Sequence, residues 1–136
     1  MKDVKTVSDI QKQLKKEPRI LASYIFGSFA LGTNNKESDF DIAVVVENKK
    51  LLKDEHVYEL LKDVSFPTNP DISIVDKTSS PIFLFQIIKS GTRIYTRDDI
   101  VVTSFEAYVL KDYYDTQHLR NIYNYYLKEK FRVKTI

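Results

Sequence analysis

Cysteine and tryptophan are absent from this chain, and histidine, glycine and proline are scarce. Without cysteine the chain has neither disulfides nor thiolate metal sites, and two distant histidines, His56 and His118, cannot build a histidine zinc site. Carboxylates are the metal ligands that remain. Three glycines and four prolines also leave no room for a low-complexity segment.

The chain also lacks an excess of one charge and a long apolar run. Its 21 Lys and Arg against 19 Asp and Glu leave a formal charge of +2, too small for a non-specific grip on nucleic acid or anionic membrane. We therefore expect no direct nucleic-acid partner and no membrane. The polar N-terminus and the absence of ~18 consecutive apolar residues predict a cytoplasmic protein. A length of 136 residues predicts a single domain, 1–136.

The hydrophobic pattern predicts strands alternating with helices over a core at residues 19–98, followed by a helical tail. Apolar, β-branched and aromatic runs predict strands over 21–26, 40–46, 72–75 and 93–95. Caps and helical spacing predict helices over 9–16 (capped by Ser8), 29–31, 51–64 and 82–89. From Ser104 onward no Pro or Gly interrupts the helical period, so one long helix is predicted over 104–130.

The most informative segment is Gly27-Ser28 followed, after residues 29–38, by Asp39-Phe40-Asp41 at the start of an apolar strand. Successive strand side chains point to opposite faces, so Asp39 and Asp41 share one face. Carboxylates held this close repel each other unless a cation lies between them. Magnesium suits such a site, because it prefers oxygen ligands and completes its shell with phosphates.

The Gly-Ser pair and a later acidic strand complete the predicted site. Gly27 has no Cβ and lets the backbone approach a phosphate, while Ser28 offers a hydroxyl and an N–H. Two-metal phosphoryl chemistry calls for a third carboxylate, and Asp71 begins the third predicted strand. Asp-x-Asp alone is usually a solvated strand edge. The order of these motifs favours a functional site.

At these residues the chain resembles the DNA polymerase beta-like nucleotidyltransferases, whose hallmark is Gly-Ser, about ten residues and Asp-x-Asp, as in GSFALGTNNKESDFDIAVV. The segments PDISIVDKTSSPIFLFQIIKSGTRIY and FEAYVLKDYYD are similar to the minimal nucleotidyltransferase antitoxins, the MntA family. The resemblance implies an α+β fold, with a small mixed β-sheet flanked by helices and a long C-terminal helix.

The resemblance also implies a function. Members of that family transfer AMP from ATP to a tyrosine hydroxyl of a cognate HEPN-domain RNase toxin, with Mg²⁺ as cofactor, and so silence the toxin. The metal-binding and catalytic residues would be Asp39, Asp41 and Asp71, and the nucleotide-binding residues Gly27, Ser28 and Ser38.

Two departures and two rival functions stand beside this hypothesis. Leu31 occupies a position where many relatives carry Arg, so Arg19 or Lys36 would have to supply the missing cation. Asp71 also follows Pro70, where an apolar residue is usual in the family, and Asp76 lies at the other end of the same strand, on the opposite face by parity. The rivals are a small-molecule, aminoglycoside-type nucleotidyltransferase and a non-enzymatic antitoxin that neutralises its partner by binding.

Tyrosines are concentrated in the predicted terminal helix, which holds six of the nine. Tyr108, Tyr123 and Tyr126 follow the apolar stripe, and we predict that they pack in the core. Tyr114 and Tyr125 fall outside the stripe and are predicted to lie at a partner interface, where tyrosine is enriched.

Overall fold

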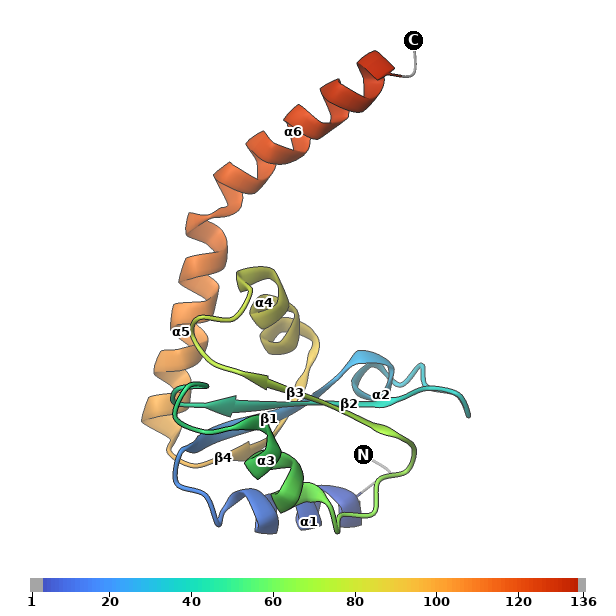
Figure 1. Ribbon diagram of the computed structural model, residues 1–136, viewed down its shortest axis with the longest axis vertical. Helices are drawn as coiled ribbons and strands as arrows, with labels where there is room; N and C mark the ends of the chain where they lie inside the picture. Colours follow the sequence, from blue (N-terminus) through green and yellow to red (C-terminus); the bar gives the residue numbers. More distant parts are fainter. Residues whose placement is uncertain (1–3, 135–136) are drawn as a thin grey trace.

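The computed structural model describes residues 4–134. A short helical turn precedes the second strand, and two long helices follow the last (Figure 1). In chain order the elements are α1 (Val4–Leu14), β1 (Ile20–Phe26), α2 (Gly27–Leu31), β2 (Phe40–Val46), α3 (Asp54–Leu61), β3 (Pro70–Val75), α4 (Pro81–Ser90), β4 (Thr92–Thr96), α5 (Asp99–Asp115) and α6 (Gln117–Lys134).

The four strands form one mixed sheet in the order β3-β2-β1-β4. β1 pairs antiparallel with β2 and β4, and β2 pairs parallel with β3 through the α3 crossover. The predicted α+β fold with a mixed sheet is confirmed. Three side chains lie in register across the sheet near the start of β2, because Phe26 pairs with Asp41 and Asp41 pairs with Asp71.

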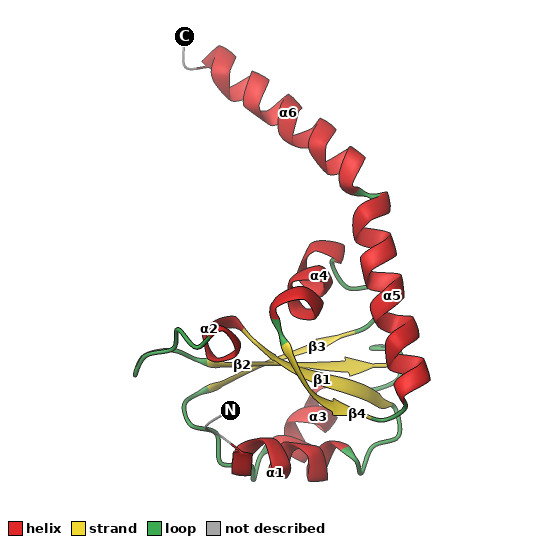
Figure 2. Ribbon diagram, turned by 180° about the vertical axis from the view of Figure 1, so that it is seen from behind, coloured by secondary structure: helices red, strands yellow, loops and turns green. Residues whose placement is uncertain are grey.

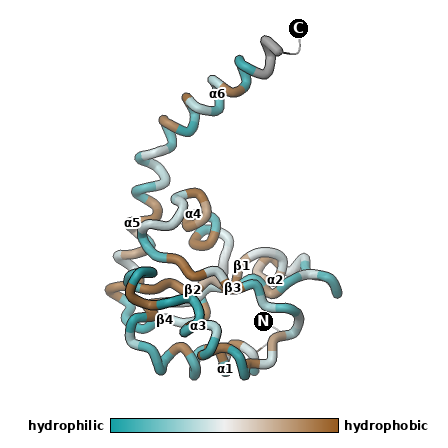
Figure 3. The backbone as a smooth tube through the Cα atoms, viewed as in Figure 1, coloured by the Kyte–Doolittle hydropathy of each residue, from teal (hydrophilic) through white to brown (hydrophobic). Residues whose placement is uncertain are grey.

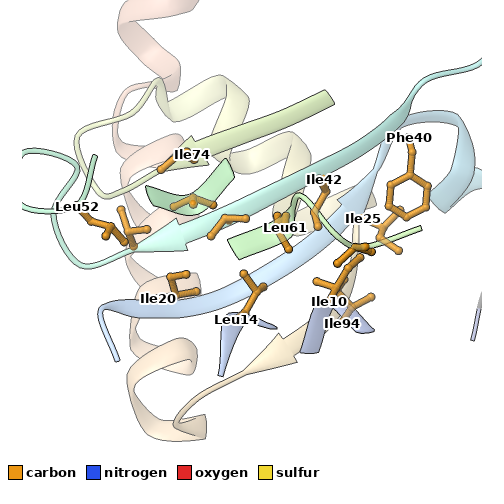
Figure 4. Packing of buried hydrophobic residues seen from close by; sticks show 14 residues of the cluster. Ile10, Leu14, Ile20, Ile25, Phe40, Ile42, Leu52, Leu61, Ile74 and Ile94 are labelled. Carbon is orange, nitrogen blue, oxygen red and sulfur yellow. The ribbon is translucent and has the colours of Figure 1, made fainter. Parts of the chain in front are cut away.

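Alternation along the strands divides the apolar side chains between two cores. One core lies between the sheet and α1 and α3; Figure 4 shows Ile10, Leu14, Ile42 and Leu61 among its members. The other lies between the sheet and α4 and α5 and includes Leu84. Figure 2 shows these helices on either side of the strands. The sheet is thus buried on both faces, which explains the continuous apolar run of β2.

Two helix predictions need correction. The first helix begins at Val4, so Ser8 lies inside it instead of capping it. Ile10 and Leu14 are buried as the spacing predicted, and Thr6 joins them on the same face through a bond from its hydroxyl to the Ser65 carbonyl (2.9 Å). The third helix is also shorter than predicted and occupies only Asp54–Leu61.

The prediction of one continuous C-terminal helix is wrong, because the helix breaks at Thr116. The Thr116 hydroxyl donates to the Asp112 carbonyl (2.8 Å), a back-bond that bends helices. Arg120 donates to the Tyr113 carbonyl (2.6 Å) and lies over the Tyr113 ring, so the junction is held in place. Tyr113 in turn stacks on Phe85 of α4, with ring centroids 3.7 Å apart.

Helix α6 extends away from the sheet (Figure 1), and its apolar residues alternate with polar ones along the projecting segment (Figure 3). The prediction that Tyr108, Tyr123 and Tyr126 are core residues is wrong: Tyr108 on α5 is 39% exposed, and Tyr123 and Tyr126 on α6 are 62% and 60% exposed. Helical spacing shows which side chains share a face, but it does not show what covers that face. None of the helices within residues 4–134 is long and apolar enough to cross a membrane.

Candidate active site

The predicted site residues come from three segments that meet on one side of the domain. β1 ends at Phe26 and leads directly into Gly27 and α2, while β2 and β3 begin there (Figure 1). The parallel register places Asp41 beside Asp71, and parity turns both side chains toward the face that α4 covers. The structure therefore brings together the Gly27 turn and two of the three predicted carboxylates.

Electrostatic coupling ties Asp41 to its acidic neighbours. The pKa of Asp41 is raised, first by burial and then by the negative charges of Asp71 and Asp39, and a side-chain hydrogen bond with Asp71 acts in the same direction. Asp41 is half-buried, whereas Asp39 and Asp71 are exposed. A cation between Asp41 and Asp71 would remove this repulsion, so the oxygen-only donor set suits Mg²⁺.

Asp39 lies one residue before β2 and does not converge on one point with the other two carboxylates. Within residues 4–134, no group of three or more His, Asp or Glu side chains is arranged to hold a metal ion. The carboxylate site is therefore an Asp41–Asp71 pair with Asp39 at its margin.

The backbone conformation and the packing at Gly27 give a second reason why this position requires glycine, one that the sequence alone does not show. Its φ is +70°, a left-handed conformation that side chains disfavour. A Cβ built at this position would also lie 2.2 Å from Oδ2 of Asp41 and 3.2 Å from its Cγ. Gly27 therefore accommodates the Asp41 carboxylate, and the Gly-Ser and Asp-x-Asp motifs are in direct contact.

The aromatic residues around the turn hold it against the sheet. Phe40, between the two aspartates, points to the opposite face and is fully buried. Its ring lies 5.1 Å from that of Phe29 in α2 and 5.5 Å from that of Phe66 before β3. Gly32 then ends α2 in a left-handed conformation, with φ of +73°. Phe40 thus packs the start of β2 against α2 and the loop before β3, a role that its place in the motif could have indicated.

Ser38 takes part in the turn that leads into the acidic pair. Its hydroxyl accepts a hydrogen bond from the Asn35 N–H (2.9 Å), and its carbonyl accepts one from the Thr68 hydroxyl (2.8 Å). These bonds tie the loop before β2 to the loop before β3. Ser38 therefore positions Asp39, and its predicted contact with a nucleotide stays a prediction.

Arg19 cannot supply the cation that is missing because Leu31 stands where many relatives carry Arg. It lies before β1, at the far end from Gly27, where its guanidinium donates to Glu17 (2.8 Å) and to the Leu51 carbonyl (2.9 Å). Lys36 is exposed in the loop next to Asp39 and remains the candidate.

Asp76 has a structural role that supports the choice of Asp71 as third carboxylate. The Asp76 side chain accepts from the N–H groups of Lys49 (2.9 Å) and Thr78 (2.8 Å). Although burial alone would raise the pKa of Asp76, these bonds and one from the Thr78 hydroxyl lower it. Asp76 therefore ties the turn after β3 to the loop after β2, away from the acidic pair.

Comparison with known proteins decides the family. The family described as "Polymerase beta, Nucleotidyltransferase" matches residues 8–100, which include the Gly27 turn and all three acidic positions. This chain belongs to the polymerase beta nucleotidyltransferase family. The nucleotidyltransferase is also 27% identical, over 106 residues, to the protein adenylyltransferase MntA of Shewanella oneidensis, covering 76% of this chain and 70% of the relative.

Solved structures confirm the fold of the nucleotidyltransferase. A chain in the crystal structure of a toxin–antitoxin with AMP-PNP superposes with a TM-score of 0.66 and 24% identity, covering 92% of this chain and 98% of that one. A chain in the complex of a tri-AMPylated Shewanella oneidensis HEPN toxin with MNT antitoxin gives 0.64 and 19%, covering 93% and 96%. The predicted resemblance is confirmed, and a nucleotide substrate follows from the family.

Proposed function

We propose that this nucleotidyltransferase is a Mg²⁺-dependent adenylyltransferase that moves AMP from ATP to a tyrosine hydroxyl of a HEPN-domain RNase toxin and thereby silences it. The observation that carries the proposal is the Asp41–Asp71 pair packed against the Gly27 turn. Support also comes from the relative called a protein adenylyltransferase and from the structural neighbour whose toxin partner is AMPylated.

Each residue then has a chemical role. Mg²⁺ would be held by Asp41 and Asp71, with Asp39 turning inward, and would neutralise the triphosphate. Gly27 lets the backbone approach the phosphates, and Ser28 binds them from the first turn of α2. The tyrosine oxygen attacks the α-phosphorus, the bond from that phosphorus to the bridging oxygen breaks, and pyrophosphate leaves. Asp71 accepts the tyrosine proton.

The exposed apolar stripe of α6 supports a protein partner. Leu119, Ile122, Tyr123 and Tyr126 are spaced along one helical face, and each is more than half exposed. Contiguous apolar surface of this kind marks protein–protein contacts in soluble proteins. We call these four residues the α6 stripe. Tyr114 and Tyr125 are also exposed, and their contact with a partner stays a prediction.

The decisive experiment is co-expression with the product of the adjoining reading frame, tested as the HEPN-domain partner, followed by intact-mass analysis of that protein. We expect added AMP with the wild-type chain and a loss of transfer of at least ~10²-fold with Asp41→Ala or Asp71→Ala. Glu37→Ala is the matched control, because it removes an exposed carboxylate two residues from Asp39. Full transfer by Asp41→Ala would disprove the assignment.

The same experiment separates the rival functions. If the Asp39→Ala, Asp41→Ala double variant still neutralises the toxin at equal stoichiometry, the chain acts by binding alone. If nucleotide is transferred to a small hydroxyl compound when no protein partner is present, the small-molecule function is correct.

A further inference from the structure

The outer edge of β3 lies next to the acidic pair, and no other strand of residues 4–134 pairs with it. The Phe40 N–H donates to the Asn69 carbonyl (2.9 Å), and Phe40 pairs with Pro70. In a strand the N–H and C=O of one residue point to the same side, and consecutive residues alternate. Asp71 therefore turns its backbone groups toward β2, while those of Ile72 and Ile74 face outward.

A hollow of about 620 Å³ accompanies this edge. Its lining includes Tyr58 of α3, Lys62 at the end of that helix, Phe66 from the loop before β3, and Pro70, Asp71 and Ile72 of the strand itself. Tyr58 is 46% exposed, so its ring is available to a ligand. We call the β3 edge and this hollow the β3 groove. It combines outward N–H and C=O groups with an aromatic wall, which are the features that bind extended peptides.

We propose that the β3 groove binds a segment of the protein acceptor as an added antiparallel strand, with the acceptor tyrosine opposite Asp71. This inference rests on the proposed function, because it names the surface on which the acceptor docks. Since Ile72 would exchange hydrogen bonds with the new strand, Asp71 would stand at the position where opposing side chains are closest, about 4.5–5.5 Å between Cβ atoms. The tyrosine would then lie on the face that holds Asp41.

The neighbours of the acceptor tyrosine would point to the other face of the extended sheet. On that face lie Ile72, which packs against the α1–α3 core, and the wall formed by Tyr58. An apolar residue before or after the tyrosine would therefore enter the hollow. The fold thus supplies one contact for the backbone and one for an apolar side chain.

A second copy of the chain is the poorer occupant of this edge. In the register that places Asp71 opposite Asp71, antiparallel pairing of β3 with β3 would set two carboxylates against each other, and like charges directly opposite are destabilising. An acceptor segment with a neutral tyrosine opposite Asp71 carries no such penalty. The acceptor is also the component that the site needs in order to react.

Amide hydrogen exchange tests the groove directly. The complex of the HEPN-domain protein with the Asp41→Ala variant is used, so that no turnover is required. We expect the Ile72 and Ile74 amides to exchange at least ~10-fold more slowly in the complex, while those of β4, at the opposite edge, keep their rates. Unchanged Ile72 and Ile74 amides in the complex would overturn the inference, as would equal protection in the chain alone at high concentration.

A kinetic test uses two helix-surface tyrosines. Tyr58→Ala removes the wall of the groove and should raise KM for the HEPN-domain protein about 10-fold while leaving Kd for ATP unchanged. Tyr108→Ala, at a similarly exposed position on α5, should change neither. If Tyr58→Ala leaves KM for the acceptor unchanged while transfer proceeds, the groove inference fails and the proposed function stands. If the wild-type chain transfers no AMP, the proposed function fails, and amide exchange still decides the groove.

Discussion

Replacement of Gly27 by alanine tests whether the Gly-Ser turn exists to accommodate the Asp41 carboxylate. The left-handed backbone, with φ of +70°, costs an alanine about 1–2 kcal/mol. The new Cβ would lie 2.2 Å from Oδ2 of Asp41, a distance that real structures do not tolerate. Because that oxygen ends a half-buried side chain, we expect Asp41 to rotate away and the backbone to stay in place.

Gly32→Ala is the matched control. Gly32 has nearly the same φ, +73°, but a Cβ there meets no atom within 4 Å. Both variants should therefore lose about 1–2 kcal/mol of stability, or ~3–8 °C in Tm. Only Gly27→Ala should lose activity, by ~10²-fold or more, because catalytic groups displaced by about 1 Å lose that much.

The assays are thermal unfolding by circular dichroism and kcat/KM for AMP transfer to the HEPN-domain protein. Any stability cost of Gly27→Ala above that of Gly32→Ala should disappear in the Asp41→Ala background, because the clashing carboxylate is gone. The reasoning is refuted if Gly27→Ala transfers AMP within about 3-fold of the wild-type rate. It is equally refuted if the two alanine variants lose the same activity.

Four further predictions concern charge, metal and the partner. Burial and the charge of Asp71 raise the pKa of Asp41, so the ionised Asp41 carboxylate destabilises the folded chain at pH 7. Asp41→Asn should therefore raise Tm in metal-free buffer at pH 7. The gain should vanish below pH 3.8, where Asp41 is protonated in the folded and the unfolded chain alike. Millimolar MgCl₂ should raise the Tm of the wild-type chain but not that of Asp41→Asn; an equal shift would exclude a metal at the pair. Hydrogen bonds from Arg19 lower the pKa of Glu17 from 4.5 to about 2, so Glu17→Gln should cost about 1–3 kcal/mol at pH 7, and the difference in Tm should close as the pH falls from 4.5 toward 2. Ile122→Glu in the α6 stripe should abolish pull-down of the HEPN-domain protein without lowering Tm, and undiminished pull-down would exclude the stripe as the partner surface.

The parts of this protein that sequence alone determined are those that depend on local chemistry. Side-chain alternation is a property of any strand, so the motif alone is enough to place Asp41 and the buried Phe40 on opposite faces of β2. Ser80 and Pro81 carry their own signals for a helix start, and α4 begins at Pro81 with a bond from the Phe83 N–H to the Ser80 hydroxyl. Order and spacing of these motifs were also enough to indicate the family.

Tertiary structure decided what depends on residues distant in the sequence. Only the pairing register places Asp71 beside Asp41, and only the packed turn brings Gly27 against that carboxylate. Arg19 was a candidate for the cation that binds phosphate, but β1 separates Arg19 from the Gly27 turn, so the two lie at opposite ends of the sheet. The tyrosines of α6 have the spacing of a core helix but face solvent. A helix that packs against another protein needs the same apolar spacing as a helix that packs in its own core, so the spacing does not distinguish the two.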